Sequence, residues 1–261
     1  MSFIRLCLRE GRLYRRNSLG FLLAISVACT LFLWLAATPA TFTVYHDALA
    51  ITFAIACAAI LIGLNMSINL ICRDFRMILR EMRMGLSSFS LIAAKTVLVL
   101  ILCGPVSLIL ILPYILGIFT IADQNTAFLF ASVYCTMATA AEIGLFVSSL
   151  AQDKPQRAAL MIPFITIFQI VFSGFIFERV QLGLFRLERL TLSFYAIRVL
   201  GSGLRFDKEQ MFWDTPYGAF IHSREHVFAN LSTLAFFFAL AGVSSALYLA
   251  LVDKGRLRQG R

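Results

Sequence analysis

Three polar residues stand in otherwise apolar segments of the sequence, where their types and spacing would allow chemistry. Asn65 and Asn69 are four residues apart and would share one face of a helix, and Glu142 lies in another apolar run. Unsatisfied polar groups are costly in hydrocarbon, so these residues are candidates for an interhelical clamp, which we favour, or for a proton-coupling or substrate site. We expect Glu142 to hydrogen-bond the asparagine face or to pair with Lys95.

Other reactive residue types form no recognisable catalytic pattern. His222 and His226 could supply half of a metal site, but no third ligand is evident and we interpret them as an ordinary polar pair. The six cysteines lie in apolar segments or at their ends, without a CxxC motif. No GxxxxGK[ST] phosphate-binding motif occurs. We therefore expect no enzyme activity and no cofactor bound by this chain, and any ATP and Mg²⁺ that its work requires would be bound by a partner subunit.

The composition determines the environment of these residues. The chain has 261 residues, of which 60% are hydrophobic and only 14% charged, and its mean hydropathy is +0.84. A soluble domain carries about 25% charged residues, so we expect an all-α integral membrane protein. The net charge of +9 comes from Lys and Arg at the ends of apolar runs, which favours membrane topology over nucleic acid as its explanation.

Apolar runs of about 20 residues, the length that crosses a bilayer, predict six transmembrane helices in one domain spanning residues 1–261. The predicted spans are Leu19 to Ala37, Ala48 to Cys72, Leu91 to Phe119, Thr126 to Leu150, Ala158 to Phe177 and Val227 to Val252. Lys and Arg gather at both termini, at residues 73–95 and at residues 154–157, whereas loops 38–47 and 120–125 contain none. Both termini are therefore expected to be cytoplasmic.

Two amphipathic helices are predicted on the cytoplasmic side. Residues 1–17 carry a basic stripe of Arg5, Arg9, Arg12 and Arg16, opposite an apolar face that Glu10 interrupts. Such a helix lies in the membrane interface or against a partner, although a simple positively charged flank is an equal alternative. Residues 73–85 place Phe75, Ile78, Leu79 and Met82 opposite Arg76, Arg80 and Arg83, with Gly85 as the stop and Ser87 or Ser88 as the next cap.

The remaining segments have less specific patterns. Residues 178–226 are apolar but regularly charged, which predicts short helices on the outer side that are re-entrant or interfacial, dipping into the outer leaflet or lying on it. Ala140, Gly144 and Ser148 have the spacing that allows close helix approach. A last group could line an apolar cavity between two subunits, with plain packing as the commoner explanation: Phe164, Phe168, Gln169 and Phe172.

Two segments resemble the type-2 ABC transporter permeases, most closely the membrane domains of the G-subfamily (white and multidrug half-transporters). RDFRMILREMRMGLSSFSLIAAK (residues 73–95) is similar to ER-x4-RE-x3-G-x-[YS]-x4-Y-x2-AK. Arg80, Glu81, Gly85, Ala94 and Lys95 match it, whereas Asp74 replaces the family Glu and Phe75 its Arg. Residues 144–177 resemble the family's segment ending in SGF, and LERLTLSFYAIRVL resembles the segment after it without the family's Trp and Pro.

The resemblance implies that residues 73–84 are a coupling helix that contacts an ATP-binding subunit, with Arg76, Arg80, Glu81, Arg83 and Gly85 as its ATPase-coupling residues. It also implies that residues 1–17 are a connecting helix, and that two permeases form a homodimer or a heterodimer. The expected protein is a permease subunit of an exporter in the bacterial inner membrane, in contact with lipids and moving a hydrophobic or lipid-like substrate.

Three alternatives remain open. A polysaccharide or lipid-linked glycan exporter shares the same architecture, and an integral-membrane scaffold or enzyme belongs to other classes. An enzyme is expected to gather His, Asp or Glu at one membrane face, which this sequence does not do.

Overall fold

The computed structural model describes residues 3–17, 24–31, 45–115, 126–173, 181–182, 185–204 and 224–259. The regular secondary structure of the described part is helical apart from one pair of two-residue strands. Four described helices are long and apolar enough to cross a membrane: α3 (Tyr45–Ser67), α5 (Ser88–Ile115), α6 (Thr126–Ala151) and α9 (Arg224–Gln259). The expectation of a helical integral membrane protein is thus supported.

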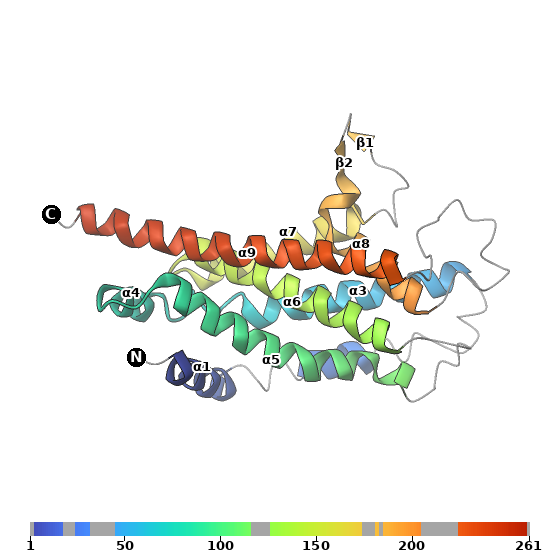
Figure 1. Cartoon of the computed structure of the whole chain (residues 1–261), viewed down its shortest axis with the longest axis horizontal. Helices are drawn as coiled ribbons and strands as arrows, with labels where there is room; N and C mark the ends of the chain where they lie inside the picture. The colour runs from blue at the N-terminus through green and yellow to red at the C-terminus, as the bar shows by residue number, and fades with distance from the viewer. Residues whose placement is uncertain are drawn as a thin grey trace.

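These four helices run along the long axis of the molecule as a bundle (Figure 1). Helix α6 is central, because it contacts α3, α5 and α9 as well as α8 (Leu192–Gly203). The largest apolar cluster joins α3, α5, α6 and α8 through residues such as Ile55, Val99 and Met137. Helix α9 covers another side of α6 and is less buried, as expected of a helix that faces lipid.

Glycines bring α3 and α6 into close contact. A Cβ atom added to Gly63 would overlap the Met137 carbonyl oxygen, and one on Gly144 would overlap Ser67 Oγ and lie 3.0 Å from the Leu64 carbonyl oxygen. Ser148, one turn after Gly144, accepts hydrogen bonds at Oγ from the backbone N–H groups of residues 71 and 72, at 3.1 and 3.0 Å. The predicted small-residue face of α6 is therefore a close-packing surface.

The predicted second span, residues 48–72, starts three residues after the start of α3 and ends five residues beyond its end. Helix α3 ends at Ser67, and residues 68–74 form turns, because the Ser148 hydroxyl satisfies backbone donors that continuing helix would have used. The predicted fourth span agrees with α6 within one residue, and α5 and α9 begin three residues before the predicted third and sixth spans.

The other two predicted spans are only partly described. Residues 24–31 are helical, whereas the rest of the first predicted span lies outside the described residues. Helix α7 (Pro155–Val171) has 17 residues, about 26 Å at 1.5 Å per residue, which is short for an apolar core of about 30 Å. The total of six spans therefore stays a prediction.

Between α7 and α9 the described chain differs in part from the predicted re-entrant or interfacial helices, because it holds one short buried helix and a strand pair. Strands β1 (Gln181–Leu182) and β2 (Phe185–Arg186) pair antiparallel, and the 3-10 helix η2 (Leu187–Leu190) leads into α8. Helix α8 is largely buried and contacts α3, α6 and α9. It is thus part of the bundle rather than a helix resting on its surface, and no strand pair was predicted here.

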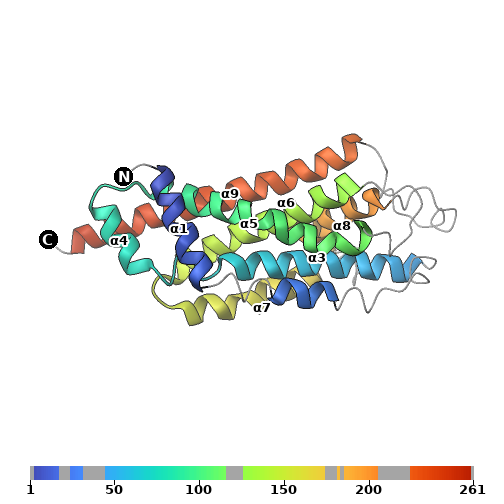
Figure 2. The same ribbon diagram turned by 90° about the horizontal axis from the view of Figure 1, so that it is seen from below.

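Two short amphipathic helices lie at one end of the bundle with the C-terminal end of α9 (Figure 1). They are α1 (Phe3–Asn17) and α4 (Phe75–Arg83). Figure 2 shows α1 crossing the direction of the long helices, the orientation of a helix that lies in a membrane interface. The structure therefore confirms that these three elements share one side of the bundle.

Candidate functional site

Helix α4 has the predicted amphipathic form. Its buried residues are Phe75, Ile78, Leu79 and Met82. They share a cluster with Leu91 and Ile92 of α5, Leu145 of α6 and Ala246 and Leu249 of α9, so α4 is seated on the ends of three long helices. Arg76, Arg80 and Arg83 are exposed on the other face. Both faces agree with the sequence prediction.

The ends of α4 are defined by local geometry. Gly85 has a φ of +97°, a left-handed conformation that favours glycine, and its N–H donates to the Met82 carbonyl at 3.0 Å. The Ser87 hydroxyl then accepts a hydrogen bond from Ser90 N–H at 3.2 Å and caps α5. Gly85 therefore acts as the predicted stop, and Ser87 is the cap rather than Ser88.

A chain of ion pairs connects α4, α1 and α5. Glu81 of α4 forms a bidentate pair with Arg9 of α1, in which Arg9 Nη2 lies 3.1 Å from Glu81 Oε2. Arg9 Nη2 also lies 2.9 Å from Glu10 Oε1, and Glu10 Oε2 lies 2.7 Å from Lys95 Nζ of α5. The Glu10 and Lys95 side chains are 3% and 0% exposed. We call these four residues the ion-pair chain.

The electrostatics of this chain favour its charged form. Burial acts to raise the pKa of Glu10, but the charges and hydrogen bonds of Lys95 and Arg9 outweigh burial, and the net effect lowers that pKa from its ordinary 4.5. The hydrogen bonds that Arg9 donates to Glu81 raise the pKa of Arg9 despite its partial burial. A buried pair holds helices in place only while both partners are present, because loss of one leaves an uncompensated charge.

Two sequence interpretations change as a result. Glu10 does not interrupt the inner face of α1: Leu6, Glu10 and Tyr14 recur every four residues and are all buried. Within the predicted basic stripe, Arg5 and Arg12 are exposed, whereas Arg9 turns toward Glu81. Glu81, predicted to contact an ATPase, also faces α1 in this structure.

The predicted pairing of Glu142 is wrong. Lys95 pairs with Glu10, and Asn65 Nδ2 donates to the Leu61 carbonyl of its own helix at 2.8 Å. Glu142 is fully buried toward α9, where a Cβ on Gly242 would lie 3.5 Å from its Oε2, and the Thr96 hydroxyl of α5 approaches it. Neither carboxylate oxygen makes a well-formed hydrogen bond with a described residue.

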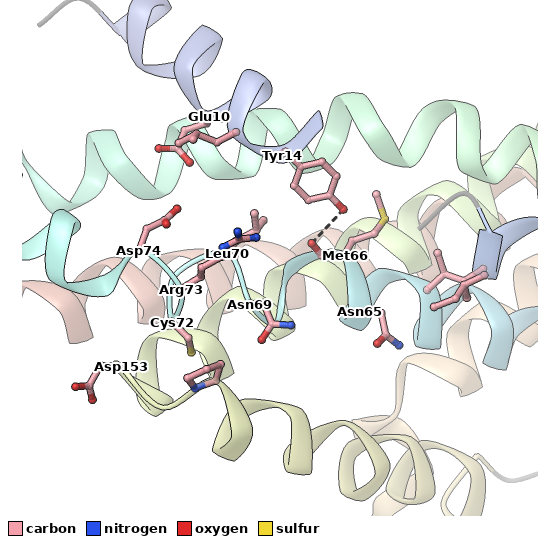
Figure 3. Close-up of a pocket in the computed structure, with 14 residues that line it drawn as sticks. Glu10, Tyr14, Asn65, Met66, Asn69, Leu70, Cys72, Arg73, Asp74 and Asp153 are labelled. Carbon is pink, nitrogen blue, oxygen red and sulfur yellow. Dashed lines mark hydrogen bonds between the residues drawn. The ribbon is translucent and has the colours of Figure 1, made fainter. Parts of the chain in front are cut away.

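Asn65 and Asn69 do not share a helix face, because α3 ends between them. They are nevertheless brought together in the lining of a cavity of about 580 Å³ (Figure 3). Its walls come from α1, residues 24–31, α3, the turns at 68–74 and the turn before α7. This cavity lies where the apolar run of α3 stops, and it was not predicted.

The residues in and just after α7 that were predicted to line a cavity differ in exposure. Phe164 and Phe168 are exposed on the described chain, and the Phe168 and Phe172 rings lie 4.9 Å apart between centroids. Gln169 is buried, and its Oε1 accepts hydrogen bonds from the N–H groups of Leu192 and Ser193 at 2.7 and 3.3 Å. Gln169 therefore fixes the start of α8 instead of lining a cavity.

The described residues hold no group of three His, Cys, Asp or Glu side chains that could bind a metal. His226 lies 3.2 Å from Asn230 Nδ2, and His222 lies outside the described residues.

Sequence reasoning missed Glu10 and Arg9 as partners. A signal was present for Glu10, because a lone acid on the apolar face of a basic helix has to find a cation when that face is buried.

A scan of protein-family models and a search of curated proteins find no match to this chain.

Proposed function

We propose that this chain is the membrane subunit of an ATP-driven ABC exporter, with α4 as the helix that receives motion from a separate ATP-binding subunit. The observation that carries the proposal is the construction of α4. Its apolar face is seated on α5, α6 and α9, its arginines face outward, and the ion-pair chain connects it to α1 and α5. A movement of α4 would therefore be transmitted to the bundle through these packing contacts and ion pairs.

The remaining parts of the proposal come from the sequence. The side of the bundle that carries α1, α4 and the C-terminal end of α9 is cytoplasmic, in a bacterial inner membrane, because the basic flanks gather there. The exposed phenylalanines of α7 are placed to face a second permease subunit, identical or related. The substrate is hydrophobic or lipid-like.

The test is co-purification of an ATPase. The chain is isolated from membranes of its own source, and proteins bound to it are identified by mass spectrometry and assayed for ATP hydrolysis. We expect a P-loop ATPase without spans of its own, and we expect Arg80→Glu/Arg83→Glu to reduce its recovery at least about tenfold, since interface charges reversed against a partner are repulsive.

The matched control is Lys154→Glu/Arg157→Glu, a double charge reversal at exposed residues of the turn before α7 and the start of that helix. This control is expected to retain the ATPase. Equal recovery with the α4 variant and with the wild type, together with intact ATP hydrolysis, would contradict the role of α4.

A further inference from the structure

The cavity described above combines polar and apolar walls beside the end of α3, a helix long and apolar enough to cross a membrane. Its volume of about 580 Å³ falls within the range of about 300–1,000 Å³ found for small-molecule sites. Ile25, Ile62 and Met66 contribute apolar surface beside the spanning helix α3, and the Asn65 and Asn69 amides lie at the polar part. Such a cavity suits a molecule with a polar head and an apolar tail.

Two of the four charged residues of the lining are already paired. Glu10 is bound by Arg9 and Lys95. Asp153 lies 3.7 Å from Arg76 in a solvent-exposed pair. These two acids therefore add little uncompensated charge to the cavity.

Arg73 and Asp74 are the charged lining residues without an ion pair in the described part of the chain. Asp74 is the N-cap residue of α4, a position where Asp usually binds the N–H groups of its own helix. Here its carboxylate makes no such bond, and its ψ of 13° is not the extended conformation that capping needs. One guanidinium and one carboxylate thus remain available (Figure 3).

We propose that this cavity binds a zwitterionic phospholipid that carries a phosphate and a primary ammonium group. The phosphate binds Arg73, which can donate two parallel hydrogen bonds, together with the Asn69 amide. The ammonium binds Asp74. The first methylenes of the acyl chains pack on Ile25 and Ile62. The inference goes beyond the proposed transport function and holds whether or not the chain moves a substrate.

The charges of the lining favour a zwitterionic phospholipid over a purely anionic lipid. A single cation with a neighbouring free carboxylate gives no net positive charge, so an anionic head group would meet repulsion from Asp74. A phosphoethanolamine head satisfies both residues and leaves no unpaired charge.

The experiment measures binding of short-chain phosphatidylethanolamine and phosphatidylglycerol to the full chain in uncharged detergent, by native mass spectrometry and thermal shift. We expect the ethanolamine lipid to bind about tenfold more tightly, and Arg73→Gln to weaken both lipids by about tenfold or more. Asp74→Asn is expected to remove the preference between the lipids. Arg157→Gln, at an exposed residue outside the lining that has no ion pair in the described part of the chain, is the matched control and is expected to change neither affinity.

A second series measures binding of soluble phosphoethanolamine and of inorganic phosphate to the same chain. Much weaker binding of both supports a lipid source, whereas affinity equal to that of the lipid overturns it. Equal affinity of the two lipids for the wild-type chain, or unchanged affinity in Arg73→Gln with an unchanged lipid-free melting temperature, also overturns the proposal. Lipid-free melting temperatures of every variant separate lost binding from lost folding.

Discussion

Two buried glutamates, Glu10 and Glu142, have opposite surroundings. Glu10 is held by Lys95 and Arg9 within a chain that connects three helices, at the end of the bundle. Glu142 is buried in α6 against a glycine of α9 without a well-formed hydrogen bond in the described structure. The comparison teaches that burial alone does not assign a role to a carboxyl group. A buried carboxylate with charged partners holds helices in position. A buried carboxyl group without partners has an unfavourable free energy of burial, which packing must offset.

The largest effect is expected from Lys95→Met, which leaves Glu10 without its α5 partner. We expect a loss of about 3–5 kcal/mol in the free energy of unfolding, measured as the melting temperature in detergent with a calibrated denaturant series. Glu10→Gln/Lys95→Met is the control, and it is expected to recover part of the loss because no unpaired charge remains. If the double variant is as unstable as the single one, charge pairing is not the cause.

The direct comparison is the same isosteric change at both sites. Glu10→Gln removes a charge-assisted interaction and is expected to cost about 1.5–3 kcal/mol. Glu142→Gln removes no well-formed partner and is expected to change stability by less than about 1 kcal/mol or to raise it. A similar large loss in both variants would show that Glu142 is also paired in the membrane.

The packing around α6 gives a third comparison. Gly63→Ala introduces a methyl group that overlaps the Met137 carbonyl oxygen, and we expect it to destabilise the protein by about 1–3 kcal/mol. Gly242→Ala places its methyl group at ordinary contact distance from Glu142, 3.5 Å from Oε2, and is expected to be tolerated. Melting temperatures of the two variants test this order, and equal losses would contradict it.

The smallest effect concerns pH. The folded pKa of Glu10 is lower than its unfolded value of 4.5, so its contribution to stability is complete above that value and is lost as pH falls through the folded pKa. We therefore expect the wild-type melting temperature to fall more steeply below about pH 4.5 than that of Glu10→Gln/Lys95→Met. Parallel curves would show that Glu10 is not stabilised by its partners.

Much of the architecture could be predicted from the sequence, because its signals are local. The apolar runs of α5, α6 and α9, the two faces of α4 and the stop at Gly85 depend on residue type and spacing. Hydrophobic periodicity and the conformational freedom of glycine act within a few residues, so neither requires knowledge of the rest of the chain.

Partner choice could not be predicted in the same way, because it depends on residues far apart in the chain. Lys95 pairs with Glu10 and not with Glu142, because α1 crosses the start of α5 and brings Glu10 Oε2 to 2.7 Å from Lys95 Nζ. The Ser148 hydroxyl of α6 accepts a backbone hydrogen bond just after the end of α3. Gln169 likewise accepts a hydrogen bond from the start of α8 rather than lining a cavity. The sequence alone therefore determined the long helices α5, α6 and α9 and the two faces of α4. The tertiary structure decided which charges meet, because a buried charge is stabilised only by a partner within a few ångströms.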